Sequence, residues 1–329
     1  MKAKSQKAAI CIGNISVKIQ DLLQNYPPHY YNQRKNNYYK KAYYFHRKQN
    51  GIIKISRWTF NYKRKSPLDL TKHPLVFRNQ NGFYTYEEST DTNKVWWVNF
   101  ADENLFGYYG SDLFAQDEIQ TLEHPLLGSV VEYLDINEIP NLISKTEEKN
   151  RVTPFFVENV PYWISVNVNP ILSSGETANI YGRNFSQEQE DIVNLGIKII
   201  QKDIKNNIIA MAAPSCGKGE YTEDQLQKLM ETVLVAFGGA VKITSKERFE
   251  KCIIHTGNWG CGAFGNNIEL MYLSQLLAAS FVGVDELVFH NANENILMDA
   301  EKKYLNLQTE NLILFLKGQH YLWNQSDGN

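Results

Sequence analysis

The pattern of apolar and polar positions divides the chain into a strand-rich first half and a second half in which helices and strands alternate. In the first half, short runs of β-branched and aromatic residues are separated by Asn, Gly, Ser and Asp, as in strands joined by turns. These predicted strands lie near residues 52–62, 74–77, 82–88 and 94–100, and a further group over 153–169 is punctuated by two prolines.

Capping signals mark helices in the second half. Ser186 with Gln189 forms a capping box ahead of the amphipathic run EDIVNLGIKIIQKDI. Thr222 with Gln225 forms another, before a helix that the glycines at 238–239 are expected to end. Strands are predicted for NIIAMAA, KCIIHTG and DELVFHN, a helix for residues 268–279, and one closing helix for AEKKYLNLQTENLILFLKG.

This order of elements predicts an α/β fold, with a mixed sheet flanked by helices and ligands bound at the carboxyl ends of its strands. Charge is distributed unevenly: residues 1–67 carry fifteen Lys and Arg against the single acid Asp21, although the whole chain has a net charge of only −2. We therefore expect a basic, Tyr-rich accessory region over residues 1–70 and an α/β domain over 71–329.

The accessory region interleaves aromatic and basic residues most densely over 26–48. Such a surface could stack bases and neutralise phosphates of a nucleic acid, or meet an acidic protein or a membrane. The alternative, favoured because no recognised nucleic-acid motif is present, is an accessory helix or loop whose tyrosines pack on the main body.

Cysteine usage points to a reducing compartment, and hydropathy gives no sign of a membrane span. The four cysteines form no C-x-x-C pair, and no apolar run approaches the roughly eighteen residues of a membrane span. The expectation is a soluble, cytoplasmic protein with no transmembrane segment. The segment SCGKGEYT lacks the glycine spacing and the Ser or Thr of a P-loop, and the seven histidines show no metal-ligand spacing.

The motif with the clearest chemistry is HTGNWGCGAFGNN, residues 255–267, between a predicted strand and a predicted helix. Its four glycines allow backbone N–H groups to approach a ligand closely, and the helix start behind them would complete a cradle for a pyrophosphate. Trp259 and Phe264 are expected to wall this pocket. The plainer interpretation is a Gly-rich turn that only lets strand and helix meet.

The stretch TGNWGCGAFG closely resembles a signature loop of the poly(ADP-ribose) glycohydrolases, which in that family belongs to a macrodomain and holds the diphosphate of ADP-ribose. The family's second motif, V-D-F-A-N followed by three glycines and Q-E-E, has a counterpart in residues 98–128. Gln116 and Glu118 match its Gln and second Glu, while Asp117 replaces the first Glu. Asn99 and Asp102 exchange the family's Asp and Asn, and one of the three glycines, Gly107, is retained in place.

The resemblance implies a macrodomain-like catalytic domain over 71–329 that removes ADP-ribose from modified proteins without a metal or a cofactor. It makes Glu118 the acid and base, with Asp117 accepting a hydrogen bond from a ribose hydroxyl. The substrate-binding residues that the motifs nominate are Asn99, Asp102, Gly107, Gln116, Gly257, Asn258, Trp259, Gly260, Cys261, Gly262 and Phe264.

Several alternatives stay open at this stage. The altered glycine run leaves poly-ADP-ribose and mono-ADP-ribose, including ADP-ribose on arginine, as possible substrates, and a non-catalytic macrodomain that only reads ADP-ribose is the rival function. Asp117 and Glu118 could be a solvated acidic helix start, and Asp102 a turn former. A thiol nucleophile made by Cys261 and His255 is disfavoured by their spacing. Richness in Lys, Asn and Ile suggests an A+T-rich bacterium, and with it an effector delivered into a host cell.

Overall fold

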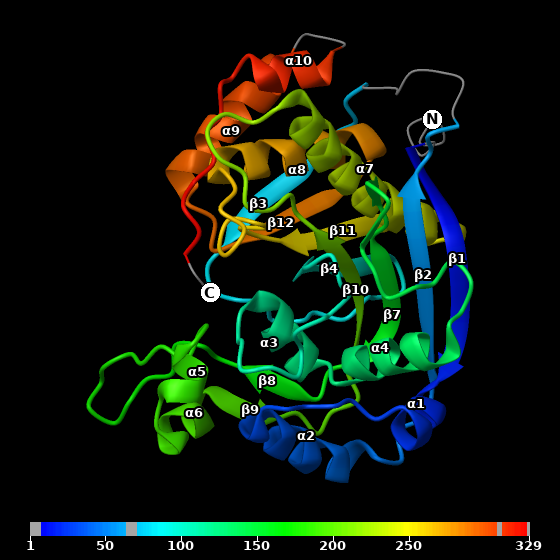
Figure 1. The fold of residues 1–329 in the computed structure, drawn as a ribbon, viewed down its shortest axis with the longest axis vertical. Coiled ribbons are helices and arrows are strands. Elements are labelled where there is room, and N and C mark those ends of the chain that lie inside the picture. The colour runs from blue at the N-terminus through cyan, green and yellow to red at the C-terminus, as the bar shows by residue number, and fades with distance from the viewer. Residues whose placement is uncertain (1–7, 64–70, 308–310, 328–329) are drawn as a thin grey trace.

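The computed structural model describes residues 8–63, 71–307 and 311–327. Its main feature is an eight-stranded mixed sheet with the order β1-β2-β7-β10-β4-β11-β12-β3 (Figure 1). The five strands from β10 to β3 run parallel, whereas β7, β2 and β1 pair antiparallel at the other edge. The strands are β1 Ala9–Lys18, β2 Ile52–Phe60, β3 Val76–Gln80, β4 Asn93–Ala101, β7 Phe155–Pro161, β10 Lys205–Ala212, β11 Lys251–Thr256 and β12 Glu286–His290.

Strand β4 shows how the sheet separates two hydrophobic cores. Trp96 and Val98 point into one core, while Trp97 and Ala101 point into the other, because successive side chains of a strand alternate between faces. Both faces are covered, so the central parallel strands are apolar along most of their length. The same alternation directs Asn99 to the face of Trp97.

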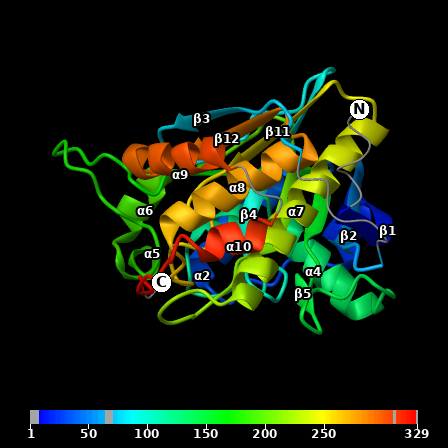
Figure 2. The same cartoon turned by 90° about the horizontal axis from the view of Figure 1, so that it is seen from above.

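Helices cover both faces of the sheet, as a mixed α/β architecture requires. Figure 2 shows α7, α8 and α9 next to one another over the first face. Among the described residues, no helix is long and apolar enough to cross a membrane. The first face carries α7 Glu223–Lys246, α8 Ile268–Val282, α9 Glu294–Asn306 and α10 Leu312–Lys317; the second carries α1 Ile19–Asn25, α2 Gln33–His46, α3 Gln116–Glu123, α4 Leu126–Asn137, α5 Asn184–Gln187 and α6 Glu190–Gly196.

Two small two-stranded antiparallel sheets complete the described strands. β5 Glu147–Glu148 pairs with β6 Arg151–Val152, and β8 Ile164–Val166 pairs with β9 Ile197–Ile199. The strand expected over residues 82–88 is not formed; this stretch is an irregular loop in which Tyr86 adopts a φ of 52°.

The N-terminal region is part of the main sheet. Strand β2 pairs with β7 on one side and with β1 on the other, so the boundary expected after residue 70 does not separate two bodies. The predicted accessory region was inferred from charge, but lysines at the solvent side of strands and helices do not prevent their apolar neighbours from joining a core. In α2, Tyr38, Tyr39 and Ala42 are buried in the second core, as the packing alternative for the tyrosines expects.

Helix boundaries differ from the sequence expectation at two places, in addition to the glycine pair of α7 described below. The Ser186 capping box does not form, because α6 begins after Gln189 and gives way to β9 at Ile197. The expected closing helix is two helices, α9 and α10, whose intervening residues 308–310 lie outside the described part. Only the capping box of Thr222 with Gln225 is confirmed at the start of α7.

The glycine pair in α7 does not end that helix, which continues to Lys246. Gly239 serves packing instead: a Cβ at this position would lie 2.5 Å from the Phe156 ring of β7. A Cβ on Gly238 would meet only Val282 and Ala9, at 3.5 and 3.6 Å. Of the two glycines, Gly239 is therefore the one that α7 needs for its close approach to the sheet.

We expect Gly239→Ala and Gly238→Ala to change stability in opposite directions. Gly239→Ala forces the buried Phe156 ring to move, at a cost of about 1–3 kcal/mol in the free energy of unfolding. Gly238→Ala should be neutral or stabilise by up to about 1 kcal/mol, because alanine loses less backbone entropy in a helix. Urea unfolding of the two variants measures both effects, and equal midpoints would contradict this packing argument.

Candidate functional site

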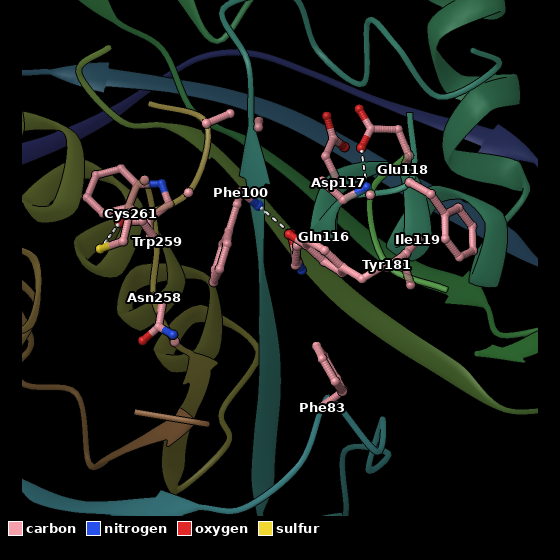
Figure 3. A pocket seen from close by; sticks show the side chains of 18 of the residues that line it. Phe83, Phe100, Gln116, Asp117, Glu118, Ile119, Tyr181, Asn258, Trp259 and Cys261 are labelled. Atoms are coloured by element: carbon pink, nitrogen blue, oxygen red, sulfur yellow. Dashed lines mark hydrogen bonds between the residues drawn. The ribbon is translucent and has the colours of Figure 1, made fainter. Parts of the chain in front are cut away.

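A cavity of about 630 Å³ opens at the carboxyl ends of β4, β10, β11 and β12. Its volume lies within the roughly 300–1,000 Å³ typical of small-molecule sites. Two motif regions line it: the glycine loop, defined as residues 257–265, and the start of α3 at residues 115–119. Figure 3 shows them on opposite sides of β4, with the Phe100 side chain between them.

The glycine loop is held in shape from behind. Gly260 has a φ of 72°, and a Cβ there would lie 2.4 Å from the Cβ of Ala213. The buried Asn266 side chain donates to the carbonyls of Pro214 and Gly260, at 2.7 and 2.9 Å. Trp259 is fully buried and donates from its indole Nε1 to the Met211 carbonyl at 3.0 Å, so it anchors the loop as well as lining the cavity.

Several backbone donors of this loop have no partner among the residues that the structure describes. The N–H groups of Cys261 and Gly265 close turns within the loop, whereas those of Gly262, Ala263 and Phe264 donate to no group in the described part of the chain. Because buried and half-buried N–H groups rarely stay unpaired, these three donors are suited to a bound anion.

Two buried carboxyl groups, Asp117 and Glu118, form what we call the acid pair, in the first turn of α3 (Figure 3). Asp117 Oδ1 accepts a hydrogen bond from Asn99 Nδ2 at 2.9 Å, and Glu118 Oε2 accepts one from the Ala115 N–H at 3.0 Å. Burial raises the pKa of both carboxyls, and the charge of Glu118 adds to the rise for Asp117. A carboxyl that keeps its proton at higher pH is suited to act as a general acid.

Gln116 fastens the start of α3 to β4. Its amide oxygen accepts from the Phe100 N–H at 2.7 Å, and its Nε2 donates to the Val98 carbonyl at 3.1 Å. Gln116 lines the cavity, but both ends of its amide are committed to β4 backbone. The side chain thereby sets the position of the two acids that follow it.

The remaining residues of the second motif divide between cavity and scaffold. Asp102 lines the cavity while its Oδ1 accepts from the Asn104 N–H at 3.1 Å, so the turn-forming and ligand-facing interpretations are compatible. Within the described residues, Asn99 and Gly107 lie outside the cavity lining. Asn99 supports Asp117 instead, and Gly107 allows a close approach to Asn104, whose Cβ would lie 2.9 Å from a Cβ at 107.

The other residues nominated in the glycine motif, Gly257, Asn258, Trp259, Gly260, Cys261, Gly262 and Phe264, all line the cavity. Burial raises the pKa of the Cys261 thiol to about 12, which disfavours the thiolate a nucleophile needs. His255 Nδ1 lies 2.9 Å from His290 Nε2 beneath the loop, rather than beside the thiol. No cluster of three His, Cys, Asp or Glu suited to a metal ion occurs in the part of the chain that the structure describes.

Two residues that the motifs did not nominate also line the cavity. Tyr181, just before α5, lies near the acid pair, and burial raises its pKa to about 12. Asp327 approaches from the C-terminal tail, such that a Cβ on Gly262 would lie 2.9 Å from its Oδ2. The tail is held there by Asn324, which donates from its N–H to the Gly265 carbonyl at 2.9 Å. Neither residue has a local sequence signal, because only the fold brings these distant segments to the cavity.

The comparisons with known proteins agree with the architecture. Residues 176–299, 124 of the 329 residues, match a family model described as "Poly (ADP-ribose) glycohydrolase (PARG), Macro domain fold". The match includes Tyr181 and the glycine loop but ends well short of α3 on the N-terminal side. Over residues 176–299 the chain is therefore similar to the poly(ADP-ribose) glycohydrolases of macrodomain fold, and its mixed sheet flanked by helices is of the macrodomain type.

Solved structures of that family are similar to this chain at low identity. A poly(ADP-ribose) glycohydrolase from Deinococcus radiodurans in complex with ADP-ribose has 14% identity and a TM-score of 0.40, covering 72% of this chain and 86% of that one. One from Thermomonospora curvata bound to the inhibitor ADP-HPD has 15% identity and a TM-score of 0.39, covering 70% and 78%. No curated protein matches the sequence.

The glycine loop yields a direct test with ADP-ribose as the probe. Gly260→Ala places a side chain at positive φ, which costs about 1–2 kcal/mol, and against Ala213 as well. We expect ADP-ribose affinity to fall at least about tenfold, measured by calorimetry. Gly175→Ala is the matched control, because Gly175 has a φ of 87° with open space around it and lies outside the cavity lining. Equal affinity in both variants would contradict a binding role for the loop.

Proposed function

We propose that this protein is an ADP-ribosyl glycohydrolase, which hydrolyses the glycosidic bond between ADP-ribose and a modified protein. The observation that carries the proposal is the shared cavity: the buried acid pair lines the same space as the unpaired N–H groups of the glycine loop. An anion-binding loop and a proton-donating carboxyl in one site are what cleavage next to a diphosphate-linked ribose requires.

In the proposed reaction, Glu118 acts first as an acid and then as a base. Its carboxyl protonates the leaving atom, which is an oxygen or, on an arginine side chain, a nitrogen. The bond from that atom to C1″ of the ribose breaks, and an oxocarbenium-like centre develops. A water molecule then adds to C1″ and gives its proton to the Glu118 carboxylate, which restores the starting state. Asp117, held by Asn99, accepts a hydrogen bond from a ribose hydroxyl and orients the sugar.

The diphosphate would be held by backbone donors. The cavity lining, as far as the structure describes it, contains no Lys or Arg, so the N–H groups of Gly262, Ala263 and Phe264 are the donors we assign to it. A site built from dipoles instead of cations depends on exact backbone geometry, which agrees with the tight packing around Gly260.

For the leaving group, we propose a single ADP-ribose on a protein side chain in preference to the polymer. Tyr108 lines the cavity at a position where the resemblance expects glycine, and the neighbouring Phe106 is fully buried at a φ of 50°. Tyr108 thus adds bulk to the cavity wall where the resemblance expects none. Arginine is one acceptor consistent with this proposal, while delivery into a host cell and the cellular location stay predictions.

The second candidate function is a reader that binds ADP-ribose without cleaving it. The loss of two of the three motif glycines favours it. It predicts the same binding but no chemistry, so a variant of Glu118 separates the two functions.

Glu118→Gln should abolish release of ADP-ribose while preserving its binding. The amide is nearly isosteric but cannot transfer the proton, and loss of a general acid costs about 10²–10⁴-fold in kcat. Released ADP-ribose is followed from mono- and poly-ADP-ribosylated proteins, with the affinity for free ADP-ribose measured separately.

Glu294→Gln is the control for that experiment, because Glu294 is an exposed acid in the first turn of α9, outside the cavity. It should leave both activity and affinity unchanged. Tight binding by the unaltered protein with no release from either substrate would overturn the enzyme and support the reader.

Asp327→Asn should tighten ADP-ribose binding. Its carboxylate lies against Gly262, where the proposed function places the diphosphate, and like charges about 4 Å apart repel by about 1 kcal/mol in water, or about fivefold in affinity. The gain should shrink as salt is added. Asp299→Asn, an exposed change on α9, should have no effect. Weaker binding by Asp327→Asn would show that this carboxylate assists the ligand.

A further inference from the structure

A fully buried lysine lies behind the acid pair. Lys35 of α2 has no exposed surface, and its Nζ donates to the Leu113 carbonyl at 2.6 Å and to the Tyr109 carbonyl at 3.1 Å. Both carbonyls belong to what we call the connecting segment, residues 102–115, which joins β4 to α3. Lys35 therefore holds the stretch of backbone that leads directly into Asp117 and Glu118.

The chain around Lys35 docks along the same segment. Asn32 donates from its N–H to the Gly110 carbonyl at 2.8 Å and from Nδ2 to Asp112 at 2.7 Å. The His29 carbonyl lies so near Gly110 that a Cβ there would be 2.4 Å away. The Tyr30 hydroxyl donates a hydrogen bond to the Thr121 carbonyl in α3, at 3.2 Å. The N-terminal region is thus the rear wall of the acid site.

Lys35 differs from Lys94 of β4, the other lysine that is buried among the described residues. Lys94 pairs directly with Glu158 and Glu247, as a buried charge normally must. Lys35 has carbonyl partners instead, and within the described residues no carboxylate lies within 4 Å of its Nζ. Burial lowers the pKa of Lys35 to about 8, and the negative charges that oppose this drop are those of Glu118, Asp117 and Asp112, the first two being the acid pair.

We propose that Lys35 is a positioning residue for the hydrolysis, which fixes the connecting segment and supplies the positive charge that sets how readily the acid pair ionises. This inference rests on the proposed function and deepens it. It assigns a role in the chemistry to a part of the chain that carries neither of the two motifs.

The direction of the charge effect follows from the groups that face Glu118. Burial raises the pKa of Glu118, and Asp102 adds to the rise, whereas Lys35 lowers it. Asp117 on the same helix and the nearby Tyr181 also act on it. Removing the charge of Lys35 therefore raises the pKa of Glu118 further. Because bond cleavage needs protonated Glu118, the alkaline limb of the rate profile should move to higher pH.

The experiment compares Lys35→Met, Lys35→Gln and Lys35→Arg over a range of pH, with kcat and kcat/KM measured on an ADP-ribosylated protein. Both neutral variants should shift the alkaline limb to higher pH and lower the maximal kcat about ten- to a hundredfold, as expected from a displaced catalytic group. Lys35→Arg keeps the charge and should keep the limb in place. Lys40→Met, an exposed change on the same helix, should match the unaltered protein.

Two neutral variants are used so that the test does not depend on the folding of one of them. If the Lys35→Met protein does not fold, the glutamine of Lys35→Gln can still donate to one of the two carbonyls. An unshifted limb in both neutral variants, or an equal shift in Lys35→Arg, would overturn the charge role. If the unaltered protein releases no ADP-ribose, the proposed function fails, but the inference can still be judged. The NMR titration of the Glu118 carboxyl carbon, assigned with Glu118→Gln, must then move to higher pH in Lys35→Gln.

Discussion

The burial of two adjacent carboxyl groups at the start of α3 is the constraint on which the rest of the site depends. Water cannot stabilise their charge, so the protein must supply hydrogen bonds, opposite charge or protons. Asn99 donates to Asp117, the Ala115 N–H donates to Glu118, and Lys35 contributes a positive charge from behind. Such an arrangement is costly for a helix that only needs to fold, but it suits a group that must give up and regain a proton.

The sheet brings the acid pair and the glycine loop together. Strand β4 lies beside β11, so the connecting segment after β4 and the glycine loop after β11 emerge at the same edge. Gln116 then ties α3 to the β4 backbone, and Trp259 ties the glycine loop to β10. The acid pair and the glycine loop are each anchored to a different central strand, which keeps the distance between the carboxyl groups and the loop N–H groups independent of the flexible side chains around the cavity.

The contacts of the N-terminal region give it a different structural role from the one that its charge suggested. Its excess of basic residues suggested a separate surface for an acidic partner, yet β1 and β2 complete the sheet and α2 packs its tyrosines into the second core. Lys35, one of those basic residues, is among the most buried side chains in the protein. Net charge along a sequence does not distinguish a solvated lysine from one that is buried and donates to backbone carbonyls.

The sequence alone determined the strands around 94–100 and 251–256, the α/β class, and the glycine loop, because these depend on local periodicity and on glycine's conformational freedom. It also nominated Asp117 and Glu118 through their motif. Only the tertiary structure decided that Gly239 packs against Phe156 inside a continuous helix and that Asn99 supports an acid and does not face the cavity. It also decided that Tyr181 and Asp327 line the cavity, while Lys35 lies behind it. Those outcomes arise from contacts between segments far apart in the chain, which leave no local pattern to detect.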